Sequence, residues 1–216
     1  MTMFVIIVTV VSLIFSATAA IDNDTIQVPL STTCRGGLGQ IYYFKYQSED
    51  FIYSQSDNFQ IIPKLEIKFY LVQPTLFKIT FQGRLYHNYG ITYTFIQVVV
   101  NGNLIIGNKV IPNTVNRGHL VPTLTYQQRE SNADIDRHGG HYYFESATAQ
   151  QVYVQTGCTR IALVYLAPGT LTFNVGIRSS IRPGTIGYSV LMFEATQIDP
   201  NANINMPLIT FTSTSL

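Results

Sequence analysis

The clearest pattern of hydrophobic and polar positions lies between Cys158 and Ala195. Residues 161–166 are apolar at nearly every position, which predicts a strand covered on both faces or one at the centre of a sandwich. The next segment alternates strictly between apolar and polar side chains, as expected of a strand with one face on a core and one in water. Its apolar positions are Leu171, Phe173, Val175 and Ile177. Residues 186–194 complete a set of three predicted strands.

Two Pro-Gly dipeptides separate these three strands, at Pro168-Gly169 and at Pro183-Gly184. Proline presets the φ angle of the second position of a type II turn, and glycine accepts the positive φ that the third position requires. Both dipeptides therefore predict turns. A helix is excluded here, because glycine and proline interrupt every segment and β-branched and aromatic residues dominate.

Similar alternation continues through the rest of the chain. The further predicted strands are 40–47, 64–71, 77–82, 92–100, 103–111, 142–145 and 150–155, with 208–211 as a short edge strand. Asn101-Gly102 joins two of them and predicts a type I′ hairpin. Residues 113–140 are polar and irregular. Eight to ten strands without helical periodicity predict an all-β protein, a β-sandwich that is jelly-roll-like, over residues 21–198, followed by a C-terminal tail at 199–216.

The N-terminal twenty residues are predicted to be a targeting segment rather than a part of the folded domain. Met3 to Phe15 form an apolar run of signal-peptide length, and the small residues of Ser16 to Ala20 suit a signal peptidase. Cleavage after Ala20 would secrete the protein and leave no stable membrane insertion; a retained anchor is the alternative. Asn23-Asp24-Thr25 then predicts N-glycosylation of Asn23, although such triplets also arise by chance.

The chain has two cysteines, Cys34 and Cys158. In an oxidising compartment two cysteines usually pair, so we expect a disulfide between them. The alternative is two separate buried thiols.

Composition narrows the classes of partner. Only 12% of the 216 residues are charged, against roughly 25% in an average globular protein, and the net charge is +1. The protein therefore has no strong positive electrostatic potential that would attract nucleic acid or an anionic membrane. The chain has 14 tyrosines and no tryptophan. Tyr86, Tyr89, Tyr142 and Tyr143 lie near predicted turns and are candidate ligand-binding residues; the alternative is that they fill half-buried strand positions.

Residues 134–145 resemble a twelve-residue calcium loop in spacing. Asp134 and Asp136 stand at positions one and three, Gly139 at six and Glu145 at twelve. His138 stands where an oxygen ligand belongs, and the flanks are not helical, so an EF-hand is excluded. A calcium site in a loop of the sandwich, using Asp134, Asp136 and Glu145, stays open as the possible cofactor site.

Two other interpretations of this loop stay open beside calcium. His138, His141 and Asp136 offer a weak transition-metal set, and a solvated glycine-rich loop needs no ligand at all. The chain has no Gly-x-Ser-x-Gly elbow, and carboxylate pairs cannot be placed from sequence. The sequence therefore assigns no catalytic residue.

The segments Leu166 to Phe173 (LAPGTLTF) and Gly187 to Phe193 (GYSVLMF) resemble two strands of secreted C1q and tumour-necrosis-factor jelly-roll modules. The resemblance implies an adhesive or ligand-binding trimer rather than an enzyme. We therefore expect a secreted, extracellular binding or adhesion module that recognises a glycan or a protein partner.

The first alternative is a self-associating structural extracellular protein, a homo-oligomer. It is favoured by the low charge and by long flat strands such as 92–100. The second alternative is a secreted hydrolase on a β scaffold.

Overall fold

The computed structural model describes residues 25–28, 40–87, 90–107, 109–120, 135–138, 140–145, 154–199 and 204–211. Strands dominate these residues, and a 3₁₀ helix, η2, covers Arg117–Leu120. The strands are β1 Thr25–Val28, β2 Gln40–Tyr46, β3 Phe51–Tyr53, β4 Gln60–Ile61, β5 Ile67–Leu71, β6 Thr75–His87, β7 Thr92–Val100, β8 Asn103–Ile106, β9 Lys109–Pro112, β10 His141–Phe144, β11 Val154–Leu166, β12 Gly169–Ser179, β13 Gly184–Gln197 and β14 Leu208–Ile209. No helix in these ranges has the length and hydropathy of a membrane span.

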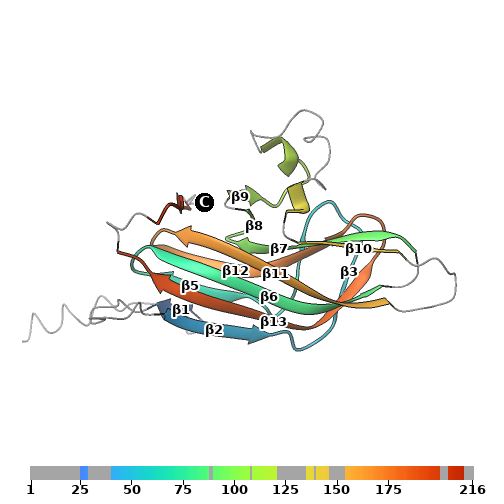
Figure 1. The fold of residues 1–216 in the computed structure, drawn as a ribbon, viewed down its shortest axis with the longest axis horizontal. Helices are drawn as coiled ribbons and strands as arrows, with labels where there is room; N and C mark the ends of the chain where they lie inside the picture. Colours follow the sequence, from blue (N-terminus) through green and yellow to red (C-terminus); the bar gives the residue numbers. More distant parts are fainter. Residues whose placement is uncertain are drawn as a thin grey trace, which may run out of the picture.

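The strands form two sheets that pack as a sandwich (Figure 1). The eight-stranded sheet has the order β1-β5-β12-β7-β8-β9, with β4 beside β12 and β10 beside β7. The six-stranded sheet has the order β14-β11-β6-β13-β2, with β3 beside β13. From β5 to β7, and again from β11 to β13, each strand passes to the other sheet, which is the arrangement of a jelly roll. The predicted all-β, jelly-roll-like sandwich is confirmed.

The main core lies between the sheets and follows from strand alternation. Leu171, Phe173, Val175 and Ile177 all point inward, as their spacing predicts. Four phenylalanines meet at the centre, with ring centroids between 5.1 and 6.4 Å apart: Phe69, Phe77, Phe173 and Phe193. They come from β5, β6, β12 and β13, so the centre ties both sheets together.

The φ angles confirm the predicted hairpin at Asn101-Gly102, whereas the two predicted Pro-Gly turns differ from each other. Asn101 and Gly102 have φ angles of 47° and 75°, as a type I′ hairpin requires. Gly169 also has a positive φ, of 141°, whereas Gly184 does not. Glycine is needed at Gly184 for space instead, because a Cβ there would collide with the hydroxyl of Tyr53 and the ring of His87. The predicted type II turn at Gly184 is therefore wrong.

Two strand predictions need correction. The predicted strand 103–111 is divided at Gly107, whose positive φ of 63° ends β8 and turns the chain into β9. Strand 92–100, β7, was expected to support self-association, but it lies inside its sheet and pairs with β12 on one side and with β10 and β8 on the other. A second cluster around Phe59, Phe95 and Val99 covers its outer surface. β7 is therefore not available for self-association.

The predicted edge strand near the C-terminus is present. β14 pairs in parallel with the end of β11, at Leu208 opposite Tyr165 and Ile209 opposite Leu166. By contrast, residues 161–166 are not covered on both faces as expected. Ala162 and Val164 lie in the core, while Ile161 and Leu163 are exposed on the other side of the sheet.

Candidate functional site

A buried ion cluster lies on the outer side of the eight-stranded sheet. Asp136 accepts from Arg117 at both oxygens, with Nε to Oδ1 at 2.9 Å and Nη2 to Oδ2 at 2.6 Å. Arg178 Nε donates to the same Oδ2 at 2.6 Å. Asp136 and Arg117 have no exposed surface, and Arg178 has almost none. Burying three charges is tolerable only because each is hydrogen-bonded to another.

Aromatic rings and an amide complete this cluster. The guanidinium carbon of Arg178 lies 4.1 Å from the ring centroid of Phe95, and those of Arg117 and Arg178 lie 5.1 and 5.7 Å from that of Phe59. Gln97 donates to the carbonyl of Asp136 at 2.9 Å and accepts from Arg160 Nε at 2.9 Å. The cluster therefore fastens the segments around Arg117 and Asp136 onto β7 and β12.

These contacts bear on the predicted calcium site. Both oxygens of Asp136 face guanidinium groups, which occupy the acceptor positions that a cation would need and repel positive charge. Glu145 instead accepts from the hydroxyl of Tyr143 at 2.7 Å, and Asp134 lies outside the described residues. The geometry gives Asp136 a structural role, and the three-residue calcium site stays an untested prediction.

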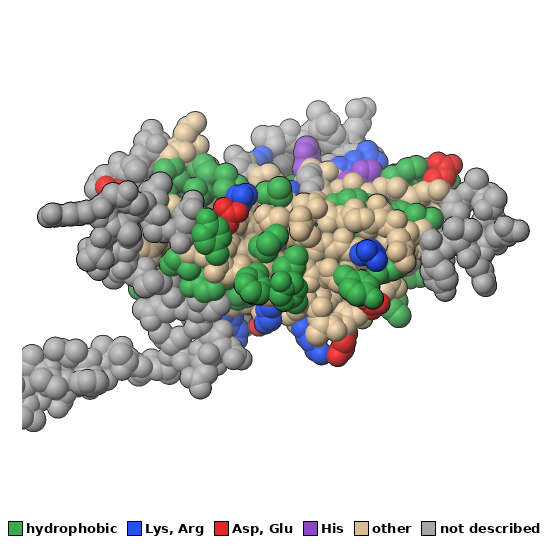
Figure 2. Space-filling model, turned by 60° about the horizontal axis from the view of Figure 1, so that its bottom comes forward, with side chains coloured by type: hydrophobic (Ala, Val, Ile, Leu, Met, Phe, Trp, Pro, Cys, Tyr) green, Lys and Arg blue, Asp and Glu red, His purple; other side chains and the backbone are tan. Residues whose placement is uncertain are grey.

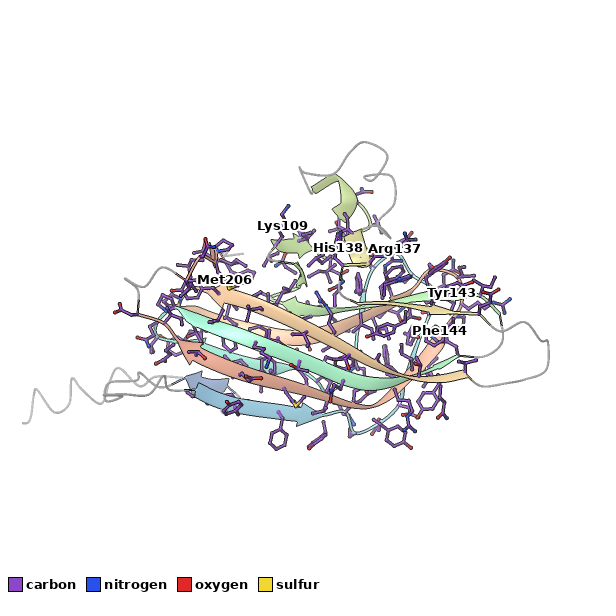
Figure 3. All side chains as sticks on the ribbon, viewed as in Figure 1. Lys109, Arg137, His138, Tyr143, Phe144 and Met206 are labelled. Atoms are coloured by element: carbon purple, nitrogen blue, oxygen red, sulfur yellow. The ribbon has the colours of Figure 1, made fainter. Side chains whose placement is uncertain are left out.

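The two histidines of the alternative transition-metal site, His138 and His141, lie in different environments. Arg137 and His138 lie on the outer side of the eight-stranded sheet, and Tyr143 lies farther toward one end of the sandwich (Figure 3). The His141 ring is stacked on Tyr93 and Phe95, with centroids 5.4 and 5.3 Å away. Within the described ranges, no three histidine, cysteine, aspartate or glutamate side chains lie close enough to hold a metal.

The candidate tyrosines have different environments. The hydroxyl of Tyr142 accepts from the amide of Thr159 at 2.7 Å and donates to its carbonyl at 2.6 Å, so it takes the place of a neighbouring strand along β11. Tyr143 is exposed, and Tyr86 is half-buried on β6. Tyr89 and the glycosylation candidate Asn23 lie outside the described residues, as does the predicted signal peptide.

Cys158 is a free thiol in this structure and is buried in the main core. This gives no support to the predicted disulfide, although Cys34 lies outside the described residues and the pairing stays untested. Burial raises the pKa of the Cys158 thiol to about 12, so it is protonated and unreactive at neutral pH.

We expect Cys158 to resist iodoacetamide at pH 8 in the native protein and to react once the chain is unfolded, without added reductant. Mass spectrometry of the alkylated peptide measures both states. Protection that persists in denaturant until a reductant is added would contradict a free thiol and restore the predicted disulfide.

The outer face of the six-stranded sheet, which points away from the other sheet, carries an apolar patch that was not predicted from the sequence. Tyr42, Phe44 and Tyr46 on β2 are 63, 65 and 67% exposed. The complete patch consists of Tyr42, Phe44, Tyr46, Ile161, Leu163, Val190 and Met192. Figure 2 shows hydrophobic side chains gathered on this surface, with isolated charged groups between them.

Strand register places these side chains on one face in two apolar groups, one on β2 and β13 and one on β11, separated by the polar side chains of β6. Phe44 lies opposite Met192, Met192 opposite Thr80, and Thr80 opposite Ile161, so one row crosses all four strands. The charged groups in the adjacent row, Lys78 and Glu194, form an ion pair at 2.6 Å and so largely neutralise each other. The alternation at 40–47 was the available signal, but a sequence cannot show which face of an aromatic strand is left uncovered.

Comparison with known proteins gives little further information. No family model matches the chain, and no curated protein does. Among solved structures, the Eiger TNF structure from S. frugiperda is similar, with a TM-score of 0.37 and 9% identity over 76% of this chain and 99% of that one. The similarity is not confined to the C-terminal third, from which the resemblance was drawn. At this level it supports no argument about function.

Proposed function

We propose that this protein is an extracellular binding module whose contact surface is the outer face of the six-stranded sheet, and that a second copy of the chain occupies its apolar patch. The observation that carries the proposal is the exposure of this patch. Among the described residues, 14 large hydrophobic side chains are exposed, and eight of them lie on strands of the six-stranded sheet. They are Tyr42, Phe44, Tyr46, Ile52, Ile161, Leu163, Tyr188 and Leu208. Exposed apolar surface concentrated in this way is typical of protein interfaces.

The composition of β11 supports the same proposal. Its residues 161–166 are apolar on both faces, a pattern typical of a covered strand, yet Ile161 and Leu163 are exposed in the single chain. A partner surface would supply the missing cover. The patch is also close to neutral, because Lys78 pairs with Glu194, so two copies can meet without net repulsion.

A protein surface suits this patch better than a sugar. The rings of Phe44 and Tyr46 are inclined at 67°, so they form no flat platform for stacking. The other side chains of the patch, such as Ile161, Leu163 and Met192, offer no hydrogen bonds. A stable protein contact buries roughly 1,200 Å² or more, which is the scale on which a sheet face makes contact.

The extracellular location belongs to the proposal as well. It is supported by the apolar run from Met3 to Phe15 and the small residues that follow it. The low content of charged residues agrees with it.

Sedimentation equilibrium of the protein without residues 1–20 tests self-association. We expect the apparent mass to rise with concentration, and Leu163→Glu to weaken association at least about tenfold, because it places a charge in the apolar contact. Ile181→Glu is the matched control, since Ile181 is 45% exposed against 43% for Leu163 but lies outside the patch, between β12 and β13. We expect this variant to associate as the wild type does.

A monomer at every concentration up to the high micromolar range contradicts self-association. Equal weakening by both variants also contradicts it, because the effect would then follow from added charge alone. If a different protein binds the wild type and is lost with Leu163→Glu, the face remains a contact surface but for another partner.

A further inference from the structure

β13 contains an irregularity at the other end of the same outer face. Its register with β6 shifts between Gly187 and Val190, which marks a β-bulge. At the bulge Tyr188 has a φ of 51°, in the left-handed region that a bulky side chain rarely adopts. The side chain is 76% exposed, so burial of the ring in this chain does not offset the backbone strain.

Buried polar side chains hold the bulge in place. Ser189 is buried, and its hydroxyl donates to the carbonyl of Gly187 at 3.3 Å. Gln47 is buried on the neighbouring segment. Its side-chain Nε2 donates to the carbonyl of Ile186 at 3.0 Å, and its backbone N–H donates to the carbonyl of Ser189 at 2.8 Å. A bulge fixed by long-range contacts directs a particular side chain outward. Here that side chain is Tyr188.

Two charged groups lie beside Gly187, the residue before Tyr188. Arg84 is the cross-strand neighbour of Gly187, and its guanidinium carbon lies 5.6 Å from the ring centroid of Tyr188. The carboxylate of Asp50 occupies the space that a side chain at Gly187 would need. Gly157 lies opposite Arg84 on its other side, and a Cβ there would meet nothing within 4 Å. Arg84 therefore borders open space.

The charges of Asp50 and Arg84 do not neutralise each other directly. No ion pair joins Asp50 to Arg84 in the part of the chain that the structure describes. One exposed acceptor, one exposed guanidinium donor and one exposed ring thus converge on a single glycine.

We propose that Asp50, Arg84 and Tyr188 form a binding site for a neutral pyranose sugar of a glycan. The C–H face of the sugar stacks on the ring of Tyr188, one hydroxyl donates to the carboxylate of Asp50, and another accepts from the guanidinium of Arg84. The open surface over Gly157 gives the next sugar unit room to lie along the sheet.

A sugar fits this set better than a protein segment does. Each hydroxyl both donates and accepts, so one ring satisfies the carboxylate and the guanidinium together without bringing net charge. A protein segment would need an acidic and a basic group in matching positions. The site shares no residue with the apolar patch, so variants at Tyr188 and at Leu163 test sugar binding and self-association separately.

Saturation-transfer NMR with cellopentaose and lactose at millimolar concentration tests the site. We expect transfer to the ring protons of at least one of the two sugars in the wild-type protein. Tyr188→Asn is expected to weaken binding at least about tenfold while keeping or raising the melting temperature, because asparagine tolerates the left-handed conformation. Tyr188→Phe is expected to keep the transfer.

Tyr70→Asn is the matched control, since Tyr70 is an exposed tyrosine on β5 of the other sheet, outside both proposed sites. We expect it to retain sugar binding. Absence of transfer from both sugars overturns the site and leaves self-association untouched. If Tyr188→Asn lowers the melting temperature as well as the sugar binding, Tyr188 has a structural role and the proposed sugar site is overturned. Binding of a protein through Tyr188, with no binding of either sugar, also overturns the sugar site.

Discussion

Replacing Asp136 by asparagine is expected to lower the free energy of unfolding by about 3–5 kcal/mol, because removing one partner of a buried ion pair leaves an uncompensated buried charge. In this protein the loss of stability is increased because two buried cations depend on one carboxylate. A single carboxylate neutralises two guanidinium groups, those of Arg117 and Arg178, which have almost no exposed surface. The side-chain amide of asparagine carries no charge and has one acceptor oxygen instead of two, so its NH₂ group would face a guanidinium donor.

Denaturation in urea, followed by circular dichroism, measures this effect. The matched control is Asp50→Asn, which removes an exposed carboxylate outside this cluster and is expected to change stability by less than about 0.5 kcal/mol. An Asp136→Asn variant as stable as the wild type contradicts the assigned role. A melting temperature that rises with Ca²⁺ in the wild type and not in this variant would return Asp136 to the predicted calcium site.

Acidification from pH 7 to pH 4 is expected to remove about 3 kcal/mol of stability through His87 alone, since each pH unit between two pKa values is worth about 1.4 kcal/mol. Burial between the two sheets lowers the pKa of His87 from 6.5 to about 4. Its Nε2 lies 2.8 Å from the hydroxyl of Tyr53 and 3.0 Å from that of Thr94, and its ring lies 4.1 Å from that of Phe144.

The sign follows from the protonation of the two states. Between pH 6.5 and about 4 the unfolded chain binds a proton at this histidine and the folded chain does not. The contribution is therefore complete above pH 6.5 and is lost progressively as the pH falls toward 4.

Urea denaturation at a series of pH values gives the slope, and an NMR titration of the His87 ring in the wild type gives its pKa directly. We expect His87→Gln to flatten the slope and His138→Gln, at an exposed position, to leave it unchanged. His141, whose pKa is also lowered by burial, adds to the slope and is retained in both variants. A His87 pKa near 6.5 contradicts the prediction.

Most strands follow from the sequence because their signals are local. Alternation at Leu171, Phe173 and Val175 depends only on the two-residue period of a strand, and Asn101-Gly102 adopts its turn for reasons internal to those two residues. Gly184 shows where local reasoning fails. Its sequence context predicts a positive φ, but the reason for glycine there is the nearness of Tyr53 and His87, which come from other strands.

The candidate sites were less accessible from sequence. The spacing of Asp134, Asp136 and Glu145 suggested a calcium loop, since spacing shows which carboxylates are close along the chain but not which guanidinium groups reach them. Arg117 and Arg178 are 19 and 42 residues from Asp136. Likewise, Tyr188 and Arg84 meet only because β13 pairs with β6.

The sequence by itself determined the all-β class, the positions of most strands and the hairpin at Asn101-Gly102, because side-chain alternation and backbone preference act over a few residues. Tertiary structure alone decided which face of each strand is covered. β7 is buried on both surfaces, while residues 161–166 of β11, which are equally apolar, keep Ile161 and Leu163 exposed. Burial depends on sheet order and long-range packing, and these decide which residues remain available to a partner.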